Sequence, residues 1–221
     1  MFEYFMPQLF IRTYRHTLWS EAFSEAITQQ IHFGQANEIP WGVSESGYCA
    51  FDDMGAYQYK AFGIPSLAVR NVRENEKIIA PYATALVLPF VPEKAARNLM
   101  QLKKLGMLGS YGFYEAADFN GENRRFIKSY MAHHQGMSLI AAANCLKNNV
   151  IVDLFHSAPE VQAGEDLLWE KPPVEGSSQQ NVRSFHKNRG ASLHHSEKAI
   201  EVYSPAIPVS YTHLDLYKRQ Q

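Results

Sequence analysis

The stretch TLWSEAFSEAITQQIHF, residues 17–33, decides the fold class of this chain. Its apolar residues recur at helical spacing, at Leu18, Ala22, Ala26, Ile27 and Ile31. A repeat of this period is typical of an amphipathic helix that turns one face to a core. Gly34 and Asn37 follow the last apolar positions and predict the end of the helix. The stretch therefore favours a helical fold.

Three later segments extend the helical pattern. Pro92 begins the second predicted helix and Gly106 ends it. The third predicted helix covers residues 125–146. A short fourth helix follows Ser157 and Glu160, which have the spacing of a capping box. We therefore expect an all-α domain.

Two long connections separate these predicted helices. They cover residues 39–65 and 109–123, and both are rich in glycine and aromatic residues. Because long ordered connections usually carry function, we expect the site there.

The composition excludes several classes of protein. Lys and Arg number 21 against 22 Asp and Glu, so the chain lacks the basic surface that nucleic acids and anionic membranes attract. The two cysteines, Cys49 and Cys145, cannot build a disulfide framework or a zinc site based on cysteine pairs. No apolar run approaches the roughly 20 residues that cross a bilayer. We expect a soluble piece with no metal, no cofactor and no nucleic-acid partner.

The helical pattern ends near Pro173. A polar stretch with neither helical nor strand period follows, so we interpret residues 1–173 as the domain and residues 174–208 as a linker toward a further module. Residues 209–221 resemble a translated adapter sequence found at the ends of proteins from metagenomic assemblies. We expect no function from this last stretch.

Both long connections carry a carboxylate among aromatic residues. The first contains WGVSESGY, residues 41–48, with Glu45 at its centre, and the second contains GSYGFYEAAD, residues 109–118, with Glu115. Aromatic rings stack on sugar rings, and cleavage of a glycosidic bond needs two carboxyl groups. This composition favours a carbohydrate site. The alternative is that either glutamate caps a helix or pairs with an arginine.

The sequence HHQG, residues 133–136, lies within the third predicted helix. Adjacent histidines point about 100° apart on a helix, so a shared metal ion is not expected. We expect one histidine to hydrogen-bond in the core and the other to reach the cleft. Tyr82, after Ala80 and Pro81, is a further candidate for the cleft.

Six motifs occur in an order that resembles one known family. They are MFEYFMP (1–7), PWGVSES (40–46), YQYKAFGIP (57–65), APYAT (80–84), YGFYEA (111–116) and MAHHQGM (131–137). Together they resemble the glucoamylase-like central domain of cyclic β-1,2-glucan synthases, over residues 1–173. The resemblance implies the C-terminal portion of an (α/α)6 barrel, similar to six-hairpin glycosidases, followed by an irregular tail.

The same resemblance implies a function and a setting. The family's domain closes the ring of β-1,2-glucan by retaining transglycosylation. Its parent protein is attached to the membrane through a glycosyltransferase region, carries a phosphorylase-like module downstream, and lies on the cytoplasmic side of the bacterial inner membrane. The alternatives are an endo-β-1,2-glucanase-type hydrolase and a non-catalytic carbohydrate-binding fragment.

The resemblance also assigns residues. Glu45 matches the retaining nucleophile, and its acid/base partner is expected upstream of Met1, which would leave this chain catalytically incomplete; Glu3 and Glu115 are the alternatives within the chain. The residues expected to bind sugar are Trp41, Tyr48, Asp52, Tyr59, Tyr82, Tyr114, His133, His134 and Gln135. We expect Glu45, Glu115 and the two histidines to converge on one face.

Overall fold

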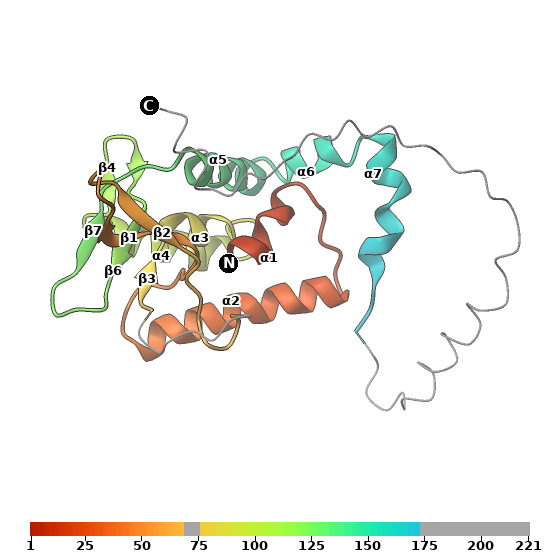
Figure 1. Ribbon diagram of the computed structural model, residues 1–221. Helices are drawn as coiled ribbons and strands as arrows, with labels where there is room; N and C mark the ends of the chain where they lie inside the picture. Colours follow the sequence, from red (N-terminus) through yellow and green to blue (C-terminus); the bar gives the residue numbers. More distant parts are fainter. Residues whose placement is uncertain (69–75, 173–221) are drawn as a thin grey trace, which may run out of the picture. The chain divides into compact units, whose positions relative to one another are not determined.

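The computed structural model describes residues 1–68 and 76–172 (Figure 1). The α-helices are α1 (Phe2–Phe5), α2 (Leu18–Ala36), α3 (Pro81–Ala85), α4 (Pro92–Lys104), α5 (Ala132–Leu146), α6 (Val150–Phe155) and α7 (Pro159–Ala163). Two short 3₁₀ helices are η1 (Pro7–Leu9) and η2 (Glu165–Trp169). The strands are β1 (Ser46–Phe51), β2 (Tyr57–Lys60), β3 (Ile78–Ile79), β4 (Leu108–Gly109), β5 (Gly112–Phe113), β6 (Ala116–Asp118) and β7 (Arg125–Ile127).

The main apolar core joins α1, α2, α3 and α5. It contains Phe5, Phe23, Ile27, Ala83 and Ala141, all of them buried. A second cluster packs α4 against the short strands through Ile79, Leu102 and Ala117. The short helix α3 contacts both α4 and α5, so it links the two clusters.

The two helices with the clearest sequence signals are confirmed. Helix α2 ends at Ala36 with Asn37 as its C-cap. Gly34 lies inside this helix instead of ending it. A Cβ atom there would lie 3.0 Å from the Cβ of Trp41, so the close approach of Trp41 favours glycine at this position. Helix α4 ends at Lys104, and Gly106 follows with a φ of 92°.

The predicted single helix over residues 125–146 is wrong in its first third. Residues 125–127 form β7, which pairs with β6 in antiparallel register, Ala116 opposite Ile127. Along β7 the side chains pass from exposed to buried, which fits the edge of a sheet, and the helix α5 begins only at Ala132. Tyr130, placed on the helix by the sequence pattern, lies in the connection.

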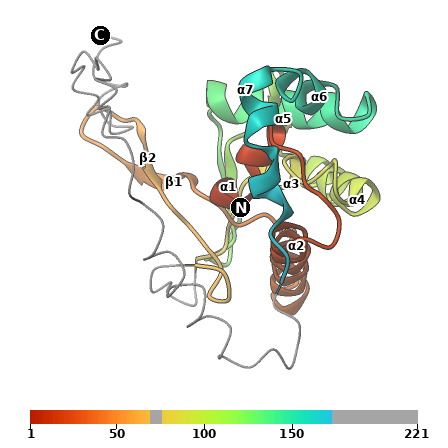
Figure 2. The ribbon, with the colours of Figure 1, turned by 90° about the vertical axis from the view of Figure 1, so that its right-hand side faces the viewer.

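The all-α expectation holds for the helices of the main core cluster but misses three small antiparallel sheets, whose strands contribute to the other two buried clusters. Their strand orders are β1-β2, β3-β6-β7 and β4-β5. The strands β1, β2, β5 and β6 lie in the predicted connections and β7 at the start of a predicted helix, whereas β3 lies in a stretch for which the sequence predicted no element and β4 begins one residue before the second connection. Figure 2 shows β1 and β2 extending away from the helices as a hairpin.

The predicted capping box at Ser157 is also wrong. The Ser157 hydroxyl donates to the carbonyl of Leu154, and Ala158 is the N-cap of α7 without a side-chain hydrogen bond. A capping box is present instead at Thr17 and Ser20, at the start of α2.

No helix within residues 1–68 and 76–172 is both long enough and apolar enough to span a membrane. The compact unit that contains these residues runs from Met1 to Pro172. The predicted linker and the predicted adapter stretch lie outside the described residues.

Candidate active site

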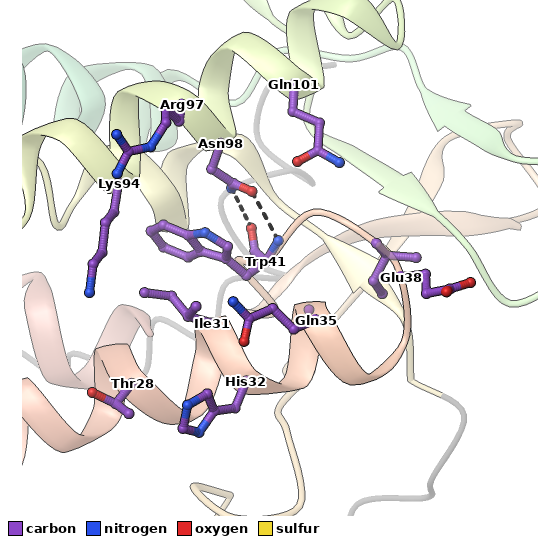
Figure 3. A pocket seen from close by; sticks show the side chains of 12 residues that line it. Thr28, Ile31, His32, Gln35, Glu38, Trp41, Lys94, Arg97, Asn98 and Gln101 are labelled. Carbon is purple, nitrogen blue, oxygen red and sulfur yellow. Dashed lines mark hydrogen bonds between the residues drawn. The ribbon is translucent and has the colours of Figure 1, made fainter.

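Two buried amide side chains hold the backbone that leads to Glu45. Gln30 on α2 bonds both backbone groups of Val43: its Nε2 donates to the carbonyl at 2.9 Å, and its Oε1 accepts from the N–H at 2.9 Å. Asn98 on α4 does the same for Trp41, at 2.8 and 3.1 Å (Figure 3). Each amide replaces the neighbouring strand that residues 41–43 lack on that side, so the loop is fixed from two helices.

Gly42 completes this brace. Its φ is 124°, a conformation that favours glycine, and a Cβ atom there would lie 2.9 Å from Thr84 Oγ1. The Gly42 carbonyl accepts the N–H of Ala80 at 2.9 Å, and Val43 forms an isolated antiparallel bridge with Ile79. The segment that precedes Glu45 therefore packs against the residues at the start of α3.

Two tyrosines hold Glu45 itself. Tyr59 on β2 donates its hydroxyl proton to Glu45 Oε1 at 2.8 Å. Tyr82 on α3 donates to the backbone carbonyl of Glu45 at 2.8 Å, and its oxygen lies 2.9 Å from Ser44 Oγ. Glu45 is half-buried, so its carboxylate is oriented by the protein and still open to solvent.

A second carboxylate is buried behind the first. Glu115 is 2% exposed; its Oε1 accepts the N–H of Gly47 at 3.1 Å, and its Oε2 lies 2.9 Å from His134 Nδ1. The other ring nitrogen, His134 Nε2, lies 3.4 Å from the hydroxyl of Tyr59. Glu45, Tyr59, His134 and Glu115 thus form one hydrogen-bonded chain, here called the relay.

Burial keeps both tyrosines of the site protonated. Desolvation is the largest cause that raises the pKa of Tyr59 far above the ordinary value, followed by the neighbouring Tyr82 and the hydrogen bond to Glu45. Desolvation also raises the pKa of Tyr82 well above its ordinary value, although the hydrogen bond with Ser44 acts in the opposite direction. Both phenols therefore act as hydrogen-bond donors at any pH at which the protein would work.

Glu45 borders a pocket of about 260 Å³. Glu3 lines the same pocket, together with Ser44 and Phe62. Glu115 does not line it, but borders a separate pocket of about 170 Å³ with His134, Tyr114 and Gln135. The structure therefore places Glu3, not Glu115, beside Glu45 at one cavity.

The remaining sequence-predicted residues are spread more widely. Trp41 is buried and lines a pocket of about 640 Å³ between α2 and α4, which Glu45 does not border (Figure 3). Asp52 lies in the exposed turn between β1 and β2 and accepts the N–H groups of Met54 and Ala56. Tyr48 packs edge-on against Phe62. The ring centroids of His133 and His134 lie 4.0 Å apart.

Sequence reasoning missed three residues that shape the site. Gln30 and Asn98 are polar positions on amphipathic helices, where a polar residue predicts a solvent-facing side chain, yet both are buried. Ser44 Oγ accepts the N–H of Phe2 at 3.0 Å and so joins the N-terminal segment to the Glu45 loop. Only the tertiary contacts identify these roles.

Comparison with known proteins gives the family. Residues 1–159 match the family of glucoamylase-like proteins (Glycoamylase). The chain is 36% identical over 179 residues to the cyclic β-(1,2)-glucan synthase NdvB of Rhizobium meliloti (strain 1021), covering 78% of this chain and 6% of that protein. The chain therefore spans a small part of this relative's length.

Solved structures share the fold. A β-1,2-glucanase from Parabacteroides distasonis matches with a TM-score of 0.57 and 19% identity, over 76% of this chain and 24% of the glucanase. A glucoamylase-like protein from Bacteroides uniformis matches with a TM-score of 0.56 and 24% identity, over 76% of this chain and 40% of the other. On the family match and the identity to the synthase, this chain belongs to the glucoamylase-like family.

Proposed function

We propose that this chain carries the nucleophile of a retaining active site that acts on β-1,2-glucan. The observation that carries the proposal is the Glu45 carboxylate: it borders a pocket, its loop is braced by Gln30 and Asn98, and one of its oxygens is held by Tyr59. A retaining enzyme needs a carboxylate that is oriented toward the anomeric carbon and remains ionised. The hydrogen bond from Tyr59 fixes the orientation of the Glu45 carboxylate.

The substrate class is supported by the relatives. The synthase that aligns with this chain over 179 residues is named for β-(1,2)-glucan. The glucanase from Parabacteroides distasonis, which shares the fold, is named for β-1,2-glucan as well. We further propose that residues 1–172 are the C-terminal portion of an (α/α)6 barrel. The reaction would be transfer of the glycosyl group to a hydroxyl of the same glucan, which closes a ring within the membrane-associated parent protein.

The acid/base residue is a separate question within this proposal. Among the carboxylates of this chain, Glu3 is the candidate, because it shares the pocket of Glu45. Glu115 is disfavoured, since both of its oxygens already have partners within the protein. Loss of turnover in Glu3→Gln would assign the role to Glu3, whereas unchanged turnover would exclude Glu3.

Chemical rescue tests the nucleophile. In the full-length protein, Glu45→Ala should lose turnover of β-1,2-glucan, and azide should restore cleavage by entering the vacated space and forming a glycosyl azide of inverted configuration. Glu21→Gln, an exposed glutamate on α2, is the matched control and should keep full turnover. Unchanged turnover in Glu45→Ala would refute the proposal.

Hydrolysis is the second candidate, because water and a sugar hydroxyl compete for the same glycosyl-enzyme intermediate. Mass spectrometry separates the two, since a cyclic glucan has the mass of the linear one less one water. Cyclic products support transfer, and linear products alone support an endo-glucanase.

A further inference from the structure

We propose that a second cavity, next to the pocket of Glu45, binds further glucose units of the same β-1,2-glucan chain. This cavity has a volume of about 470 Å³ and lies among α1, the start of α2 and η2. It is here called the outer cavity. The proposal rests on the proposed function for its class of substrate, and it extends the site from the reacting sugar to the chain attached to it.

The outer cavity adjoins the pocket of Glu45. Glu3 and Tyr4, neighbours on α1, line both cavities, whereas Glu45 lines only the smaller one of about 260 Å³. A glucan chain whose reacting unit lies at Glu45 therefore enters the outer cavity when it continues past α1. The volume of the outer cavity is within the range of about 300–1,000 Å³ in which proteins bind small ligands.

Three segments that are far apart in the sequence form the walls of the outer cavity. They contribute Tyr4 and Gln8 from α1 and η1, Trp19 and Phe23 from α2, and Leu167 and Leu168 from η2. The N–H of Leu18 donates to the carbonyl of Glu170 at 2.7 Å, which ties the end of η2 to the start of α2 (Figure 1). The cavity is therefore held by contacts of the folded chain.

Aromatic rings give the outer cavity surfaces on which a sugar can stack. Trp19 is 47% exposed, and its ring is stacked on Phe23 with the centroids 5.8 Å apart. The ring of Tyr14 is stacked on Trp169, with the centroids 4.1 Å apart and an interplanar angle of 24°. Trp19 and Tyr14 are thus each held by a second ring while they line the cavity. Flat apolar faces with polar edges match a pyranose ring, whose faces are apolar and whose edge carries the hydroxyls.

The polar groups of the outer cavity favour a neutral ligand. Arg12 Nη2 is paired with Asp153 at 2.7 Å, and Arg12 Nη1 lies 3.5 Å from Glu165, so the charge of this guanidinium is already balanced. The hydroxyl of Thr13 donates to Gln8 Oε1 at 2.7 Å, which leaves the amide nitrogen of Gln8 as the end that donates. Sugar hydroxyls fit these groups better than a phosphate or a carboxylate does.

The contribution of the outer cavity should depend on the length of the glucan. A β-1,2-linked disaccharide can occupy the pocket of Glu45 alone, whereas a long linear glucan reaches both cavities. Trp19→Ala should therefore weaken the binding of the long glucan about 10-fold, in the range of one aromatic contact, and leave the binding of the disaccharide unchanged.

Isothermal titration calorimetry of the full-length protein measures both affinities, with Glu45→Gln as the background that prevents turnover. Trp19→Phe keeps a flat ring and should retain most of the affinity for the long glucan, whereas Trp19→Leu keeps only apolar bulk and should behave like Trp19→Ala. Met100→Ala, which removes a side chain of α4 that is 52% exposed, is the matched control and should change neither affinity. An unchanged affinity of Trp19→Ala for the long glucan, or equal losses for both ligands, would overturn the proposal.

The accessibility of Trp19 gives a second readout, which needs no change at Glu45. In the full-length protein, acrylamide should quench the part of the tryptophan fluorescence that is missing in Trp19→Phe, and the long glucan should protect this part from quenching. If acrylamide does not reach Trp19 in the free protein, another part of the protein covers the outer cavity, and the proposal is wrong.

The outer cavity and the nucleophile can fail separately. Full turnover in Glu45→Ala, together with a loss of long-glucan affinity in Trp19→Ala, would refute the proposed role of Glu45 and support the outer cavity as a glucan site. Loss of turnover in Glu45→Ala, together with an unchanged affinity in Trp19→Ala, would support the nucleophile and overturn the outer cavity.

Discussion

The ring of Tyr82 lies flat against the imidazole of His134, while the hydroxyl at its other end donates to the backbone carbonyl of Glu45. One side chain of α3 therefore contacts both the first helical turn of α5 and the loop that presents the proposed nucleophile. This contact links the apolar core to the site, because Tyr82 is itself a member of the main core cluster.

Tyr82→Phe should weaken the Glu45 loop but keep the ring stacking. The variant removes the hydroxyl contacts with Glu45 and Ser44, so the free energy of unfolding should fall by about 1–3 kcal/mol. Urea denaturation measures this loss. Tyr82→Leu should cost more, since it also removes the contact with His134; equal stability of the two variants would contradict this account.

High pH should destabilise the protein through the same tyrosines. An unfolded phenol ionises near pH 10, whereas burial raises the pKa values of Tyr59 and Tyr82 in the folded state. The unfolded state then binds fewer protons, so the free energy of unfolding falls as the pH rises above 10. In a titration followed at 295 nm, these two tyrosines should ionise only as the protein unfolds. Tyr59→Phe and Tyr82→Phe should each reduce that late absorbance step, and an unchanged step in both would contradict the assignment.

Asn98→Leu should destabilise the chain far more than its helical position suggests. The variant leaves the buried N–H of Trp41 without its partner, at a cost of about 1–3 kcal/mol. Gln101→Leu, at an exposed position of the same helix α4, is the matched control and should change the free energy of unfolding by less than about 0.5 kcal/mol. Thermal unfolding of both variants checks the difference.

Removing the side chains of Thr17 and Ser157, the two candidate helix caps, should lower the free energy of unfolding by different amounts. Thr17 Oγ1 accepts the N–H of Ser20, so Thr17→Ala should cost about 0.5–2 kcal/mol. Ser157 caps no helix, and Ser157→Ala should stay within about 0.5 kcal/mol of the wild type. A larger loss for Ser157→Ala, measured by urea denaturation, would restore the capping box that the sequence pattern predicts there.

Helices with a strong period could be predicted, and short strands could not. Helix α2 is confirmed because its apolar face repeats over 19 residues. The strand β7 has only three residues, and its pairing with β6 depends on a partner that no local pattern reveals. Its apolar residues, Phe126 and Ile127, were therefore assigned to the helix that follows.

Some residues of the site could be predicted from the sequence and others could not. Glu45, Tyr59 and His134 were identified from motifs and the family resemblance, and the structure joins them in one chain of contacts. Gln30 and Asn98 could not be identified, because a buried amide on a helix differs from a solvated one only in what packs around it. The relation between Glu115 and His134 likewise required the fold, since 19 residues separate them.

The most direct test of the central claim is the site of covalent attachment during turnover. In full-length protein quenched with acid while it acts on β-1,2-glucan, peptide mass mapping should find the glycosyl group on Glu45. A glycosyl group on Glu3 or Glu115, or on any other residue, would contradict the assignment of Glu45 as the nucleophile.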